Sequence, residues 1–123
     1  MLLCFAVDKC AVSPTGDRLY IISRYWHDKL LTLARDGTLL ATFTDPALEN
    51  PWGLHVTPAG QVLVCGRLSH TVLQVGLEGK SKLANLATHQ DGVRYPWSVC
   101  YSSTTSSIIV GQWGDNILVF RVE

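Results

Sequence analysis

Residues 51–66 read PWGLHVTPAGQVLVCG, in which two apolar runs flank a turn that contains Pro58 and Gly60. After a short polar break, residues 72–75 add a third apolar run, VLQV. Runs this short, rich in Val and Leu and bounded by Gly, Pro, Ser or Thr, are typical of β-strands. The stretch therefore predicts consecutive strands joined by tight turns.

The same pattern occurs three times along the 123-residue chain. The second Pro-Trp pair, at 96–97, follows the first by 45 residues, and Gly16 precedes Gly60 by 44. A period near 44 residues with about four strands per repeat is typical of β-propeller blades. We therefore predict an all-β fold of about three four-stranded antiparallel blades. The predicted strands that define the repeat are 10–12, 19–22, 30–33, 39–43, 52–56, 62–65, 72–75, 97–101, 108–111 and 117–120.

The approximate blade boundaries are 1–46, 47–92 and 93–123, and the last blade lacks its outer strand. Asp36-Gly37 and Glu78-Gly79 occupy the same place in successive blades, where a tight turn needs a residue that tolerates positive φ. The run 62–65 is apolar throughout, which predicts burial on both faces of its sheet.

Propellers close with roughly four to eight blades, and we expect about six in the complete ring. Three blades would leave apolar faces uncovered. Two explanations stay open. Either the chain is a fragment of a longer propeller, or it is a half-propeller that dimerises, with residues 2–7 supplying an outer strand to its partner.

The composition argues against a broad electrostatic partner. Ten basic and ten acidic residues give a formal net charge of zero, so global charge does not draw the chain to nucleic acid or to a membrane. No stretch reaches the 18 apolar residues of a membrane span, and we expect no membrane partner. Residues 1–7 lack a basic leader and predict a strand rather than an export signal.

The cysteines show no Cys-x-x-Cys spacing. Three of them fall in or next to predicted buried strands, where Cys behaves as a small hydrophobe. We predict free thiols and a cytoplasmic location, while a disulfide stays open. The four are Cys4, Cys10, Cys65 and Cys100.

The order of these segments resembles that of the NHL-repeat β-propellers, whose repeat runs from a Pro-x-Gly opening to a strand of the Val-Gln-Val-Phe type and an Asp-Gly turn. The segments that carry the resemblance are 51–53, 58–60, 62–64, 69–75 and 78–79, with 28–37 and 115–120 matching the same portion of the other blades. The chain looks most similar to the C-terminal propellers of tripartite-motif proteins, which carry RING and B-box domains upstream. That resemblance implies a scaffold of the ubiquitin pathway or an RNA-binding module. Four scattered cysteines do not form a RING zinc array, so ubiquitin transfer would need a domain outside this chain.

An enzyme is the third hypothesis, because some propellers similar to this one are lactonases or lyases with a metal in the axial channel. Only His55 and Cys100, at matching positions of adjacent blades, have side chains suited to such a site. A catalytic metal site usually needs about three protein ligands. We therefore predict no catalytic residue, no metal and no cofactor, with His55 as a hydrogen-bonded core histidine. Trp52 and Trp97 are predicted to pack between blades, while a ligand-facing rim stays open as the alternative.

The candidate binding site lies in the loops at one end of the strands. Because strands in a meander alternate in direction, the connections between second and third strands emerge beside those that join successive blades. We name this end the break-loop face. Arg, Tyr and Trp dominate protein-interface hot spots, and the same residue types stack on single-stranded RNA. We predict a non-catalytic module that binds a protein, with RNA second, although solvated loops without a ligand also fit the pattern. The predicted binding residues are Arg24, Tyr25, Trp26, His27, Arg67, His70, Arg94, Tyr95 and Trp113.

Overall fold

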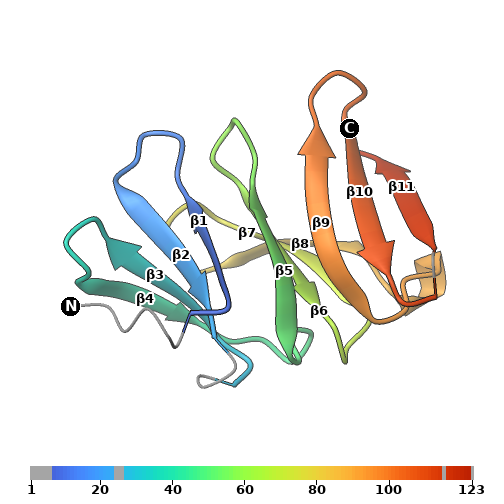
Figure 1. Ribbon diagram of the computed structural model, residues 1–123, viewed down its shortest axis with the longest axis horizontal. Helices are drawn as coiled ribbons and strands as arrows, with labels where there is room; N and C mark the ends of the chain where they lie inside the picture. The colour runs from blue at the N-terminus through green and yellow to red at the C-terminus, as the bar shows by residue number, and fades with distance from the viewer. Residues whose placement is uncertain (1–6, 24–26, 115, 123) are drawn as a thin grey trace.

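The computed structural model describes residues 7–23, 27–114 and 116–122. Strands in these ranges form three antiparallel sheets, with orders β1-β2-β3-β4, β5-β6-β7-β8 and β9-β10-β11 (Figure 1). The first sheet contains β1 (Lys9–Val12), β2 (Arg18–Ile22), β3 (Leu30–Ala34) and β4 (Leu39–Phe43). The second contains β5 (Pro51–Val56), β6 (Val62–Gly66), β7 (Thr71–Val75) and β8 (Lys82–Ala87). The third contains β9 (Pro96–Ser102), β10 (Ser107–Gln112) and β11 (Ile117–Arg121), and a short 3-10 turn, His89–Asp91, precedes it.

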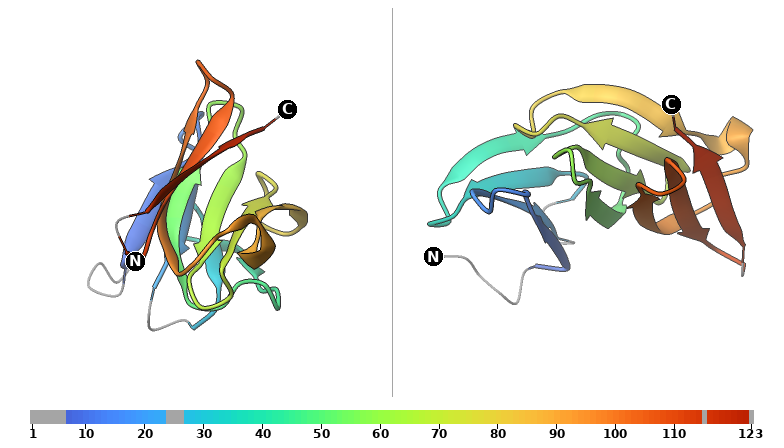
Figure 2. Two further views of the ribbon diagram at one scale, coloured as in Figure 1. Left: turned by 90° about the vertical axis from the view of Figure 1, so that its right-hand side faces the viewer. Right: turned by 90° about the horizontal axis from the view of Figure 1, so that it is seen from above.

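The three sheets fan out side by side, with β5 beside both β1 and β9 at the inner edge (Figures 1 and 2). Each sheet is a meander in which every strand pairs with the next along the chain. This is the arrangement of consecutive propeller blades, and the prediction of an all-β, blade-like fold is confirmed. The predicted strand in residues 2–7, apart from Val7, lies outside the described residues.

The turns follow from glycine. Gly37 and Gly79 have φ of 92° and 74°, as the Asp-Gly and Glu-Gly positions predict. A side chain at Gly79 would also overlap the hydroxyl of Thr32 in the first blade. Glycine is therefore required there both by the turn and by close packing between blades.

The middle blade contributes to two separate cores. Val62, Val64, Leu73 and Val75 pack against the first blade, in a cluster with Tyr20, Ile22, Leu30 and Phe43. The alternate residues face the third blade, and their cluster includes Leu63, Cys65, Val72, Val99, Ile108 and Val110. Every residue of β6 is buried, as its apolar run predicts. Burying a Val or Leu side chain contributes roughly 1.5–3 kcal/mol, so both junctions between blades are hydrophobic cores in their own right.

The outer faces of the fan are less covered. In β11, Leu118 and Phe120 pack toward the second blade, and the alternate residues Ile117 and Val119 are exposed. The prediction that the cysteines are buried holds for Cys65 but is wrong for Cys10 and Cys100, which are exposed on inner strands of the outer blades. Cys4 lies outside the described residues.

Candidate binding face

The two junctions between blades are joined by the same hydrogen bond at the break-loop face. At the first junction, the backbone N–H of Asn50 donates to Oδ1 of Asp28 at 2.7 Å. At the second, the N–H of Tyr95 donates to Nδ1 of His70 at 3.0 Å. In each case the acceptor lies two residues before the apolar run of the third strand, and the donor immediately precedes the proline that opens the next blade. We name these two contacts the junction bonds.

All four residues of the junction bonds have a positive φ: 59° at Asp28, 54° at Asn50, 54° at His70 and 46° at Tyr95. Asp, Asn and His enter this region more readily than other residues with a side chain, whereas a bulky residue such as Tyr is unusual there. Residues held in such a conformation often lie at functional sites. The repeated backbone geometry thus marks the break-loop face independently of its composition.

The second junction gathers rings and cations around its junction bond. The ring of His70 makes edge contacts with Tyr95 at 4.5 Å and with His89 at 5.2 Å, measured between centroids. The guanidinium carbon of Arg67 lies 5.7 Å from the ring centroid of Trp52 and 5.9 Å from that of Tyr95. Both rings are partly open to solvent, at 41% and 39% exposure. We name these five residues the Arg67 cluster.

Backbone contacts hold the loops that carry the cluster. The N–H groups of Arg67 and Leu68 each donate to the preceding connection, to the carbonyl groups of Asn50 and Glu49, at 3.1 Å. The hydroxyl groups of Ser69 and Thr71 both donate to the carbonyl of Ala47 at 2.6 Å. The Arg67 loop is therefore fixed before any ligand arrives.

Arg94 stabilises the neighbouring connection. Its guanidinium donates to the carbonyl of His89 at 2.7 Å and to its own neighbour, Val93, at 2.9 Å. Its N–H donates to Oε1 of the buried Gln112 at 2.8 Å, and the amide of Gln112 donates in turn to the carbonyl of Gly92 at 3.2 Å. One guanidinium nitrogen of Arg94, Nη1, and its backbone N–H are thus used within the loop.

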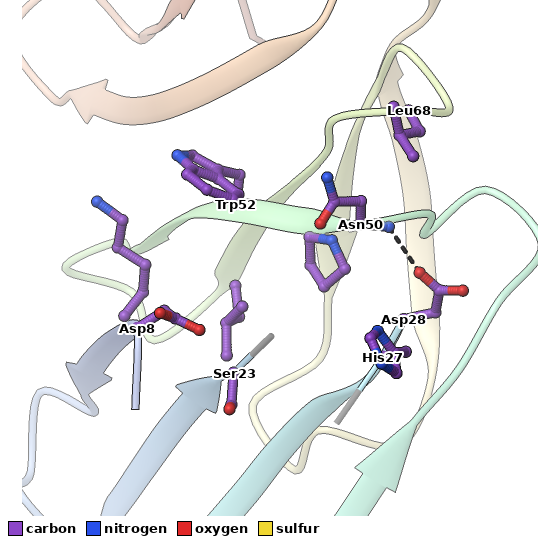
Figure 3. Close-up of a pocket in the computed structure, with 10 residues that line it drawn as sticks. Asp8, Ser23, His27, Asp28, Asn50, Trp52 and Leu68 are labelled. Carbon is purple, nitrogen blue, oxygen red and sulfur yellow. Dashed lines mark hydrogen bonds between the residues drawn. The ribbon is translucent and has the colours of Figure 1, made fainter. Parts of the chain in front are cut away.

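A hollow of about 560 Å³ lies at the first junction on the same face (Figure 3). Trp52 and Leu68 border it from the second blade, and Asp28 and His27 from the connection in the first (Figure 3). Trp52 also belongs to the Arg67 cluster, so the hollow and the cluster share this ring. The remaining lining residues are Asp8, Lys9, Ile22, Ser23, Asn50 and Pro51.

The surroundings of His70 favour the neutral form of its ring. Burial lowers the pKa of His70, and electrostatic interactions with His89 and Arg94 lower it further, while Glu49 acts in the opposite direction. A lowered pKa favours the neutral ring, whose Nδ1 can accept the hydrogen bond from Tyr95.

His55, the candidate residue on the inner strand β5, differs from the prediction. Nε2 of His55 is buried without a hydrogen-bond partner among the described residues, so the prediction of a hydrogen-bonded core histidine is wrong at this atom. Burial lowers the pKa of His55 and raises that of the Cys65 thiol to about 12. Within residues 7–23, 27–114 and 116–122, no three His, Cys, Asp or Glu side chains are grouped so that they could hold a metal.

The structure brings only part of the predicted binding set together. Tyr95 contacts both Arg67 and His70, and His27 lines the hollow. Trp113 is 63% exposed in the connection between β10 and β11. Arg24, Tyr25 and Trp26 lie outside the described residues.

Sequence reasoning missed one member of the Arg67 cluster and ranked a second below packing. His89 lies in a connection that reaches the break-loop face, but the histidine itself was not selected. For Trp52, packing between blades was preferred over a ligand-facing rim, and its partly exposed ring beside Arg67 fits the rim. The sequence position of Trp52 could have indicated its exposure at this site, because Trp52 is the second residue of β5 and this strand begins at the break-loop face.

Comparisons with known proteins support the fold. The sequence matches no family model and no curated protein. Among solved structures, the chain is similar to hydrazine synthase of Kuenenia stuttgartiensis, with a TM-score of 0.76 and 18% sequence identity. The match covers 94% of this chain and 32% of that one, so this chain spans about a third of its structural relative. At this identity the likeness shows a shared propeller-like fold. In the part of the chain that the structure describes, no helix has the length and apolar character needed to cross a membrane.

Proposed function

We propose that this chain is a non-catalytic binding module whose break-loop face recognises a protein partner. The observation that carries this proposal is the placement of Arg67 against Trp52 and Tyr95 on a fixed loop, beside a hollow. Trp, Tyr and Arg supply most hot-spot energy in protein interfaces. A site formed before binding also loses less entropy when the ligand arrives.

The resemblance of the repeat to NHL propellers of tripartite-motif proteins supports a more specific version of this proposal. In that version the chain is the substrate-recognition part of a cytoplasmic ubiquitin-pathway scaffold. The catalytic RING would then belong to another segment or to a partner.

Single-stranded RNA is the second candidate ligand, favoured by the same exposed rings beside an arginine. Bases stack on aromatic side chains, and each such contact contributes about 1–3 kcal/mol. RNA binding would weaken steeply as salt rises, because phosphate contacts release counterions. Binding to a protein would respond less to salt.

A displayed library of random peptides, selected on the immobilised chain, tests the proposal. We expect the selected peptides to bind the unmodified chain and to lose at least tenfold in affinity when Trp52→Ala is introduced. Arg35→Ala is the control, because Arg35 is an exposed residue in the turn between β3 and β4, at the opposite end of the strands. Selected peptides that bind Trp52→Ala and the unmodified chain equally would overturn the assignment to this face, as would a library that yields no binder.

A further inference from the structure

Among the described residues, the guanidinium of Arg67 lies beside aromatic rings and has no acidic partner. Among the described residues, no carboxylate forms an ion pair with its guanidinium, which also donates no hydrogen bond. The guanidinium lies over two aromatic rings, those of Trp52 and Tyr95. By contrast, Arg18 and Lys82 each form an ion pair with an aspartate.

A ring beside a guanidinium restrains it without using its N–H groups. Guanidinium carries five donors in a planar fork, and aromatic rings interact with its face through cation–π attraction, which contributes roughly 0.5–1 kcal/mol at exposed sites. The donors at its edge remain available. A carboxylate can then accept two of them in parallel, which is the strongest and most directional contact that arginine makes.

The surroundings favour an isolated acidic group over a polyanion. Among the described residues, the adjoining hollow is lined by the carboxylate of Asp28, which already accepts the N–H of Asn50, and by Lys9. A phosphate backbone that continued from Arg67 into the hollow would meet the Asp28 carboxylate. An apolar side chain, by contrast, would meet Trp52 and the half-exposed Leu68.

We infer that Arg67 binds the carboxylate of an Asp or Glu residue in a partner polypeptide, and that the residue next to this acid places an apolar side chain against Trp52 and Leu68. The inference rests on the proposed function and adds the chemistry of the partner. The ligand is thus a short acidic and apolar segment of an extended chain.

Two properties of peptides selected on the unmodified chain test the inference. First, we expect the selected sequences to share an Asp or Glu beside a large apolar residue. Second, replacing that acid by its amide, Glu by Gln, should weaken binding at least tenfold to the unmodified chain, measured by calorimetry or by Trp fluorescence. In Arg67→Ala the acidic peptide and its amide should bind equally, and Arg67→Lys should restore only part of the difference, because lysine lacks the fork.

Controls separate this inference from the proposed function. Arg35→Ala should keep the preference for the acid, and an unchanged melting temperature would show that Arg67→Ala is folded; Arg67→Gln serves if it is not. Peptides that depend on Trp52 but bind equally as acid and amide would overturn the inference and leave the proposed function standing. A preference for the acid that survives Arg67→Ala would also overturn it. Displacement of the acidic peptide by oligo(U) at physiological salt would show that phosphate is the preferred anion and would overturn it as well.

Discussion

At each of the two junctions between blades, a side chain accepts a hydrogen bond from a backbone N–H of the next connection, but the accepting side chain differs. At the first, a carboxylate, Asp28, accepts the N–H of Asn50 beside an open hollow. At the second, an imidazole, His70, accepts the N–H of Tyr95 within a group of rings. The fold requires a backbone N–H to be satisfied at this point, and either acceptor meets that need. The choice of acceptor therefore leaves the fold intact but changes the chemistry of the surface around it.

The largest expected effect comes from emptying one core. Tyr20 is fully buried in the first junction, and its hydroxyl donates to the carbonyl of Leu77 in the second blade at 2.5 Å. Tyr20→Ala should lower the free energy of unfolding by about 3–5 kcal/mol, as expected for an aromatic side chain removed from a core. Leu63→Ala, at the equivalent position of the second junction, should cost about 2–5 kcal/mol. Urea unfolding measures both.

Tyr20→Phe is the matched control, because it keeps the ring and removes only the hydrogen bond, worth about 1 kcal/mol. A loss below about 1 kcal/mol in Tyr20→Ala would show that the first junction contributes little to stability.

The next largest effect is expected for a substitution at Gly66, which precedes the Arg67 loop and tests that loop rather than the core of the second junction. A Cβ at Gly66 would lie 2.6 Å from the carbonyl oxygen of Ala47 and 2.9 Å from Oγ1 of Thr71. Gly66→Ala should therefore cost about 1–3 kcal/mol, typical of overpacking, and should displace the Arg67 loop. Thermal unfolding and binding of the selected peptides measure the two consequences.

Gly76→Ala is the control in the same blade, because its added Cβ would meet only ordinary contacts, at 3.5 Å or more. Equal stability of the two variants would mean that the loop at Gly66 relaxes without cost.

The third prediction uses pH to distinguish the junctions. The lowered pKa of His70 means that the unfolded chain takes up a proton near pH 6.5, before the folded chain does. The unfolded state then binds more protons than the folded state. The contribution of His70 to stability is therefore fully present above this pH and is lost as the pH is lowered through it. The charged and titratable groups that act on His70 are His89, Arg94 and Glu49.

The pKa of His55 is also lowered, so this residue makes stability depend on pH in the same direction. The unmodified chain is therefore compared with His70→Asn, because both contain His55 and differ only at His70. Asn tolerates the positive φ and offers an oxygen acceptor that does not titrate. Between pH 7.5 and pH 5, we expect the melting temperature of the unmodified chain to fall about 4 °C further than that of His70→Asn, the shift of one hydrogen bond in a domain of this size. Identical pH profiles would show that His70 is not responsible.

The smallest effect is expected for Trp113, which is mostly exposed outside both junctions. Trp113→Ala should change the free energy of unfolding by less than about 0.5 kcal/mol, as for other exposed positions. A loss of more than 1 kcal/mol in urea unfolding would instead indicate that this ring packs against the third blade.

The sequence predicts the strands better than the site, for a physical reason. Short apolar runs such as 62–65 and turn glycines such as Gly79 determine local backbone geometry, and both are read directly from neighbouring residues. Arg67, His70 and Tyr95 could be assigned to one face because strands in a meander must alternate in direction.

The junction bonds and the exposure of Trp52 depend instead on how one blade packs on the next. Asp28 and Asn50 are 22 residues apart, and nothing local to either indicates their contact. The exposed Cys10 and Cys100 show the same limit, because an apolar residue in a strand is buried only where another blade covers it.

The alternation along β6 has a consequence for how such a chain can evolve. Successive side chains of this strand point to opposite junctions, so Val62 and Val64 belong to one core and Leu63 and Cys65 to the other. Inserting a single residue within the strand would turn every side chain beyond the insertion toward the opposite junction, so both cores would be disrupted at once. The loops can therefore gain or lose single residues. In β6, by contrast, only conservative substitutions, or insertions and deletions of two residues, keep each side chain in its own core.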